Sequence, residues 1–198
     1  MTHLLLLKTG ALVVIIAAVV IVLILIFAIV AWYISCYNRL QRLKNLTEEG
    51  WATIDVQLKK RYDLIPNLVE TVKGYAKHES GTLEAVIRAR NAAMTASGDA
   101  KMQAENVLTG TLKTLFSLTE AYPELKANTN FLDLQNQLKS IEAEIASARR
   151  YYNGTVKELN TRIDVFPSNI VARRMRLEKR KYFELDSVEE RKAPTVKF

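Results

Sequence analysis

The chain has 198 residues, of which 49% are hydrophobic and 25% are charged, with four prolines and seven glycines. This length accommodates one folded domain and an appended segment, and the composition excludes a disordered or a fibrous protein. Cys36 is the single cysteine, which excludes an internal disulfide framework and a thiolate metal cluster. The net charge of +7 favours a nucleic acid or an anionic membrane surface as a partner.

A long apolar stretch follows a short N-terminal leader of residues 1–8. No residue from Thr9 to Asn38 is charged, and most are Ala, Val, Ile, Leu or Phe. About 20 apolar residues cross a bilayer as a helix, so we predict a transmembrane anchor over residues 9–37. Trp32 and Tyr37 lie at its end, where aromatic rings prefer the headgroup region. The stretch exceeds the apolar core of about 7–15 residues in a cleaved signal peptide, so we expect the anchor to be retained.

Basic residues flank the anchor unequally. Lys8 precedes it, whereas Arg39, Arg42 and Lys44 follow it. Because basic flanks stay in the cytoplasm, this asymmetry predicts a cytoplasmic C-terminal domain. Cys36, at the end of the anchor, could carry an acyl chain or could simply be a small apolar residue near the end of a helix.

Helical periodicity continues beyond the anchor and predicts an all-α fold. Residues 38–166 indicate an antiparallel up-and-down bundle of about four long helices, and the anchor continues into the first of them. Pro66 lacks an N–H and clashes with the preceding turn, so the first helix is predicted to end near Tyr62. The second helix is then predicted to begin at Pro66, to be capped by Asp63, and to run to about Ala96.

The next two predicted helices carry regular apolar stripes. After a stop at Ser97-Gly98-Asp99, the third helix has one apolar face: Val107, Leu108, Leu112, Leu115, Phe116 and Tyr122. In the fourth, apolar residues alternate by three and four: Phe131, Leu134, Leu138, Ile141, Ile145, Ala148 and Tyr152. Such a seven-residue repeat predicts a coiled-coil seam or the core side of a bundle helix. Pro167 ends this helix, and residues 167–198 are predicted to form a short basic helix over Ser168–Lys181 and a charged tail.

Two groups of polar residues are candidate sites. The first surrounds the predicted turn at Pro66 and consists of Arg61, Asp63, Asn67 and Glu70. We favour a structural role, because helix ends need polar partners, over a docking surface. The second is a basic run of Arg173, Arg174, Arg176, Lys179, Arg180 and Lys181. In an antiparallel bundle this run would lie at the membrane-proximal end and could face anionic lipid; the alternative is a solvated face.

No pattern indicates a catalytic, cofactor or metal site. His78-Glu79 begins like a zinc-protease helix, but Thr82 stands where the second histidine would be. The many carboxylates lie near basic residues at helical spacing, such as Asp55 and Lys59, which predicts exposed ion pairs. Nucleic-acid binding is disfavoured because aromatic residues do not interleave with the basic run.

Several motifs in order resemble the bacterial LemA family. They are Trp51–Glu79, Asn130-Phe131, Ala148–Asn153 and Phe166–Ile170, and the resemblance covers about Tyr37 to Phe183. The resemblance implies a membrane-anchored antiparallel helical bundle in the bacterial inner (cytoplasmic) membrane. It implies no catalytic residues and no cofactor, and the family's biochemical role is poorly defined.

The predicted function is that of a non-enzymatic, membrane-anchored scaffold or interaction protein. One alternative is an enzyme or enzyme subunit with a site in the bundle core; another is a binder of anionic lipid or nucleic acid through the basic tail. A buried polar cluster beside a pocket would favour the enzyme, whereas an apolar core throughout would argue against it. A homo-oligomer is also predicted, because Ala143, Ala146 and Tyr151 add apolar surface outside the seam of the fourth helix.

Overall fold

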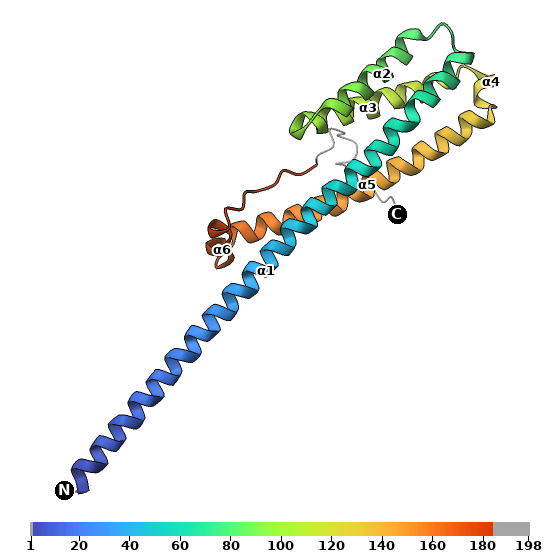
Figure 1. Cartoon of the computed structure of the whole chain (residues 1–198). Helices are drawn as coiled ribbons and strands as arrows, with labels where there is room; N and C mark the ends of the chain where they lie inside the picture. The colour runs from blue at the N-terminus through green and yellow to red at the C-terminus, as the bar shows by residue number, and fades with distance from the viewer. Residues whose placement is uncertain (1, 184–198) are drawn as a thin grey trace, which may run out of the picture. The chain divides into compact units, whose positions relative to one another are not determined.

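α1 is one uninterrupted helix, Thr2–Tyr75, that contains both the predicted anchor and the first predicted bundle helix (Figure 1). The computed structural model describes the backbone of residues 2–183 and the side chains of residues 15–98 and 100–183. All regular secondary structure in this part of the chain is helical, which confirms the predicted all-α class. The predicted leader, from residue 2 onward, belongs to α1, and the predicted charged tail from residue 184 lies outside the described residues.

The helices that follow α1 within residues 2–183 are α2 (Ser80–Thr95), α3 (Gly98–Thr119), α4 (Pro123–Lys126), α5 (Thr129–Asp164) and α6 (Ser168–Arg174). The described residues divide into two compact units. The anchor unit is 2–46 with Lys157–Arg180, and the bundle unit is Thr47–Val156 with 181–183. In the bundle unit, α2 and α3 lie side by side and antiparallel, joined by a short connection (Figure 1).

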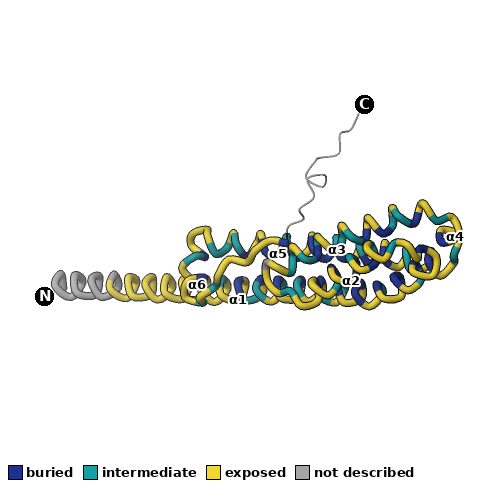
Figure 2. The backbone as a smooth tube through the Cα atoms, turned by 90° about the horizontal axis from the view of Figure 1, so that it is seen from above, coloured by how far each residue is buried: buried dark blue, intermediate teal, exposed yellow. Residues whose placement is uncertain are grey.

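The core of the bundle unit is built from the predicted apolar stripes. Along α5 the buried positions are Phe131, Leu138, Ile141, Ile145, Ala148, Tyr152 and Val156. On α3, Leu108, Leu112 and Leu115 are buried, but Val107 is 59% exposed, so its predicted core position is wrong. Figure 2 shows buried positions recurring along the bundle helices, whereas residues 15–35 of α1 are exposed throughout.

Pro66 lies inside α1, so the predicted helix boundary at this proline is wrong. A proline within a helix leaves the carbonyl four residues earlier, here that of Tyr62, without its backbone donor. Arg90 on α2 donates its Nε–H to that oxygen at 2.8 Å and replaces the missing bond. The hairpin turn therefore lies at residues 76–79, after α1 ends at Tyr75, and the predicted second helix is split between α1 and α2.

The predicted basic helix over Ser168–Lys181 is also too long, because α6 ends at Arg174. Arg176 has a φ of 53°, a left-handed conformation that does not continue a right-handed helix. The N–H of Leu177 bonds to the carbonyl of Ala172 at 3.1 Å, which closes the end of α6.

Side-chain amides of α5 hold the non-helical segment after α6. In the anchor unit, Asn160 accepts the N–H of Arg180 at 2.9 Å and donates to its carbonyl at 2.8 Å. In the bundle unit, Asn153 makes the same two bonds with Phe183, at 2.8 and 3.1 Å. The buried Phe183 ring packs 5.8 Å from the Trp51 ring, centroid to centroid, so the segment completes the bundle core.

Candidate functional site

A buried arginine joins three helices of the bundle unit. Arg61 on α1 is fully buried and forms an ion pair with the equally buried Glu105 of α3. Its guanidinium also donates to Glu142 of α5 at 2.6 Å and to the Thr109 hydroxyl of α3 at 3.1 Å. Losing one partner of a buried ion pair costs about 3–5 kcal/mol, because the other charge stays buried. The network therefore fixes the register of α1, α3 and α5.

Tyr62 extends this network on the side facing α2. Its hydroxyl donates to the Glu105 carboxylate and lies 3.3 Å from the carbonyl oxygen of Ala93. Burial and the bond to that carboxylate raise the pKa of the Tyr62 hydroxyl above its ordinary value of 10.0. The hydroxyl therefore remains a proton donor at neutral pH and is unsuited to act as a base or nucleophile.

The polar residues predicted to gather at Pro66 do not form a cluster. Arg61 points into the core, whereas Asp63, Asn67 and Glu70 are exposed along the continuous helix. Asp63 pairs with Lys59 at 2.7 Å, one turn earlier. The proposed turn-stabilising role is therefore wrong, because there is no turn at that position.

Two further ion pairs involve carboxylates of α1. Glu70 pairs with Lys73 at 3.5 Å on the exposed surface. Asp55, predicted to pair with Lys59, instead lies 3.5 Å from the Lys101 ammonium of α3.

The interior position of Arg61 had a signal in the sequence, because it falls on the same face as the buried Leu58 and Ile65.

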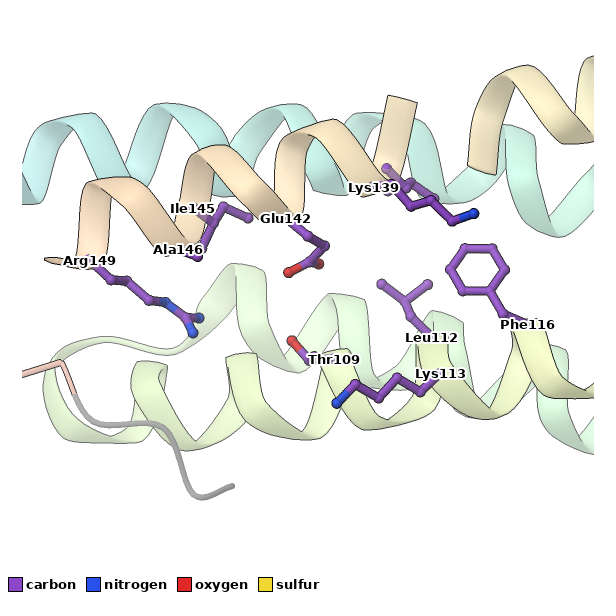
Figure 3. Close-up of a pocket in the computed structure, with 10 residues that line it drawn as sticks. Thr109, Leu112, Lys113, Phe116, Lys139, Glu142, Ile145, Ala146 and Arg149 are labelled. Atoms are coloured by element: carbon purple, nitrogen blue, oxygen red, sulfur yellow. The ribbon is translucent and has the colours of Figure 1, made fainter. Parts of the chain in front are cut away.

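A groove of about 360 Å³ opens between α3 and α5, next to the buried network (Figure 3). Its apolar lining is Leu112, Phe116, Leu138, Ile145 and Ala146, and its polar lining is Thr109, Lys113, Lys139, Glu142 and Arg149. In Figure 3, the Glu142 carboxylate and the Thr109 hydroxyl face each other across the groove, and both bond to Arg61. This volume lies near the lower end of the range for small-molecule and cofactor pockets.

The charge on the groove is predominantly positive. Lys113 and Lys139 are exposed and form no ion pair with any described side chain. The guanidinium of Arg149 lies 4.3 Å from the centroid of the Phe183 ring, a cation–π contact at one end of the groove. The single carboxylate in the lining, Glu142, shares the Arg61 guanidinium with Glu105, so the three basic side chains of the lining outnumber its one carboxylate. An anionic, partly apolar molecule would complement this surface.

Comparison with known proteins identifies the fold family. A family model described as the LemA family matches residues 50–198. The chain belongs to the LemA family. Protein LemA of Metamycoplasma hominis is 26% identical over 163 residues, covering 79% of this chain and 73% of that protein. This confirms the resemblance seen in the sequence motifs, and the part matched to the LemA family contains both the Arg61 network and the groove.

The basic run of this LemA-family chain is solvent-exposed. Arg173 and Arg174 lie on α6, and the other members lie on the following segment. Lys179 pairs with Asp164 at 2.8 Å, which holds the segment against the end of α5. The contact of this run with anionic lipid stays a prediction.

The bundle of this LemA-family chain also contains a buried polar cluster beside a pocket. That combination was expected to favour an enzyme over a binding module. Glu142 joins the two features, because it bonds to Arg61 and its side chain is 37% exposed toward the groove. The arrangement can bind an anion or orient a ligand, and it holds one carboxylate in reach of solvent.

Proposed function

We propose that this LemA-family chain is a non-enzymatic, membrane-anchored interaction protein whose groove between α3 and α5 receives an acidic amphipathic helix of a partner protein. The observation that carries the proposal is the groove itself, which has an apolar floor and two exposed lysines, Lys113 and Lys139, without described ionic partners. An apolar stripe on the partner would cover the floor, and carboxylates beside it would meet the lysines.

The geometry of the groove favours a helix as the occupant. The groove runs between two helices, and its floor has residues spaced by four on α3, Leu112 and Phe116. On α5, Leu138 and Ile145 are separated by seven. Leu112, Leu138 and Ile145 are buried in the bundle core, so a third helix would contact mainly the partly buried Phe116 and Ala146. The occupant is therefore inferred to carry apolar residues at i, i+3 or i+4, and i+7, flanked by Asp or Glu.

The non-enzymatic assignment is supported by how fully the polar groups are engaged. The Thr109 hydroxyl donates to the carbonyl oxygen of Glu105 at 3.0 Å and accepts from Arg61. Glu142 is held by the same guanidinium, and the Tyr62 hydroxyl is held by Glu105. A catalytic nucleophile or base needs a reactive lone pair that faces a substrate. The Thr109 and Tyr62 hydroxyls are engaged within the network, which leaves the partly exposed Glu142 carboxylate as the group that an enzyme would use.

An enzyme with a site in the bundle core is the second candidate, favoured by the exposure of Glu142 in the groove. Glu142→Gln keeps the size of the side chain and removes its charge. A deletion strain complemented with this variant separates the two functions if the folded variant still binds its partner. Loss of complementation with binding intact would favour the enzyme.

The membrane anchor is proposed from α1. Among the described residues, α1 is the one helix long and apolar enough to cross a bilayer. Residues 15–35 are exposed, which leaves their apolar surface for lipid. Arg39, Arg42 and Lys44 follow the apolar stretch and support a cytoplasmic bundle at the inner membrane of a bacterium.

Site-specific photocrosslinking in living cells tests the groove. A photoreactive amino acid at Ala146, which lines the groove, is compared with one at Ser147, which is exposed on the same helix outside it. The expected result is a crosslink at Ala146 alone, to a protein segment with the acidic amphipathic pattern, that is lost when Lys113 and Lys139 are both changed to Glu.

Three outcomes would overturn the proposal. One is an equal crosslink at both positions. Another is a crosslink to lipid. The third is a crosslink to residues 184–198 of the chain itself, whose Glu-Leu-Asp-Ser-Val-Glu-Glu sequence has a similar chemistry. In that case the tail occupies the groove, and a partner does not.

Self-association in the membrane is a separate part of the proposal. Tyr151 is 47% exposed, and Ala143 is exposed on the same helix, so α5 has apolar surface outside its core face. A second copy of the chain could cover this surface. Light scattering of detergent-solubilised protein, with the detergent mass subtracted, should give a multiple of the protomer mass. A protomer mass over a broad concentration range would contradict it.

A further inference from the structure

The corner between α5 and α6 presents apolar side chains to solvent beside the predicted end of the anchor. Phe166 is 79% exposed, Ile170 is 56% exposed and Val165 is 41% exposed. All three belong to the anchor unit. A largely exposed phenylalanine with apolar neighbours is typical of a surface that meets a membrane or a partner.

This corner is a rigid part of the anchor unit. The Ser168 hydroxyl is buried at the corner and lies within hydrogen-bond distance of the carbonyl oxygens of Arg162 and Val165, at 2.8 and 3.0 Å. Val171 and Ala172 of α6 are buried against Leu40 of α1. The exposed Phe166 therefore results from a packed structure and is not a loosely held loop residue.

A cleft of about 180 Å³ separates the corner from α1. Its α1 side includes Trp32, Cys36 and Arg39, and its other side includes Arg162, Val165 and Phe166. Arg39 is half-exposed and pairs with Glu158 at 3.1 Å. Arg162 is partly buried and forms no ion pair with the described residues. Each side of the cleft therefore carries one aromatic ring and one guanidinium group.

The depth of this cleft in a bilayer follows from the helix. Lys8 and Arg39 are the charged residues that bracket the apolar stretch. At 1.5 Å per residue they are about 46 Å apart along α1, close to the thickness of a bilayer with its headgroups. Arg39 then lies at headgroup level, and Trp32 lies about 10 Å deeper, at the boundary with the acyl chains.

We propose that the cleft between α1 and the α5–α6 corner binds an anionic phospholipid, with Arg39 and Arg162 at its phosphate and Phe166, Val165 and Ile170 inserted among neighbouring acyl chains. The proposal rests on the membrane anchor inferred above. The cleft is distinct from the basic run, because its arginines lie on α1 and α5, whereas the basic run lies on α6 and the segment that follows α6. Guanidinium groups bind phosphate through paired hydrogen bonds, and aromatic rings insert at the same depth.

The insertion of the corner is tested on full-length protein in nanodiscs. In a Cys36→Ser background, a single cysteine at Phe166 or at Lys157 carries an environment-sensitive dye. Lys157 is the matched control, because it is an exposed position of α5 in the same unit. The dye at 166 should shift to the blue and be quenched by lipids with a quencher on the acyl chain, and the dye at 157 should not.

The selectivity of the cleft is tested by the lipid that stays bound. Nanodisc protein containing equal amounts of phosphatidylglycerol and phosphatidylcholine is extracted into mild detergent, and its retained lipids are measured by native mass spectrometry. The wild type should retain phosphatidylglycerol in excess. Arg162→Gln should lower that excess about fivefold, the factor for one basic residue at an anionic surface, whereas Arg174→Gln on α6 should not.

Two results would overturn the proposal: equal quenching at positions 166 and 157, or equal lipid ratios for Arg162→Gln and the wild type. Loss of selectivity only in Arg174→Gln would assign the lipid contact to the basic run instead. If the protein fails to enter nanodiscs at all, the proposed anchor is wrong, which is distinguishable from a failure of the cleft.

Discussion

The Nε–H of Arg90 donates to the carbonyl oxygen of Tyr62 at 2.8 Å, and that oxygen is the acceptor that Pro66 cannot serve. The contact joins α2 to the middle of α1. Tyr62 follows Arg61 directly, so the hydrogen bond that replaces the one missing at Pro66 lies next to the buried network. The Arg90 side chain thus substitutes for the backbone donor that Pro66 lacks, and the same bond holds α2 against α1.

Arg90→Met should destabilise the bundle by about 1–3 kcal/mol, because the Tyr62 carbonyl loses its donor. In a Pro66→Ala background the backbone N–H at residue 66 can serve that carbonyl, so the cost of Arg90→Met should fall. Pro66 is exposed, so Pro66→Ala removes little packing. A double-mutant cycle by urea unfolding in mild detergent measures the coupling. Additive effects would show that Arg90 acts elsewhere.

This contact also explains why the sequence placed a helix boundary wrongly. The proline is visible in the sequence, and its local effect is correctly a break. The compensating donor comes from Arg90, which is distant in sequence. Rules that use only neighbouring residues to predict helix ends cannot take such a contact into account. The true turn at 76–79 has no proline, and the N-cap position Glu79 makes no side-chain capping bond, so its local signal is weak.

The long helices were predictable because burial on one face leaves a repeat in the sequence. α5 follows the three-and-four spacing from Phe131 to Tyr152 as the sequence predicts. The candidate site was less predictable. Arg61 was singled out for a turn that does not exist, and its partners Glu105 and Glu142 belong to helices whose relative register no local pattern specifies.

Tyr62 should make stability depend on pH in the alkaline range. Its hydroxyl has a pKa raised above the ordinary 10.0 in the folded protein. Above pH of about 10 the unfolded chain releases this proton while the folded protein retains it, so rising pH favours unfolding. The loss is at most about 1.4 kcal/mol for each pH unit. Tyr62→Phe should lack this component when unfolding free energies are compared at neutral and alkaline pH. Parallel pH profiles would contradict the assignment.

Gly50 should resist replacement, because α1 and α5 approach each other closely there. A Cβ at residue 50 would lie 3.3 Å from the Cα of Tyr152 and 3.3 Å from the ring of Tyr151. Gly→Ala in an open helix position stabilises by about 1 kcal/mol. Gly110→Ala and Gly154→Ala, which have open space around the new methyl group, should show that gain. Gly50→Ala should lose it or destabilise the bundle, as measured by the unfolding midpoint. An equal gain at all three positions would show that the helices can separate freely.

The seam of α5 should carry much of the bundle's stability. Leu138 is 1% exposed and Ile141 is 9% exposed, so Leu138→Ala or Ile141→Ala should each cost about 2–5 kcal/mol. Leu132 on the same helix is 38% exposed, and Leu132→Ala is the matched control with a much smaller expected cost. Denaturant unfolding of the three variants measures the differences. Equal costs at Leu138 and Leu132 would mean that the predicted seam does not form the core in solution.

The bundle should lie on the cytoplasmic side of the membrane. Three basic residues, Arg39, Arg42 and Lys44, follow the anchor, and only Lys8 precedes it within the leader. Positively charged flanks are retained in the cytoplasm during insertion, so protease added to spheroplasts should leave a C-terminal epitope tag intact until detergent is added. Changing the three following residues to Gln and adding lysines before the anchor should reverse the asymmetry and expose the tag. If the tag of the unmodified protein is digested without detergent, the bundle lies on the opposite side of the membrane. The flanking charges then do not control the insertion of this helix.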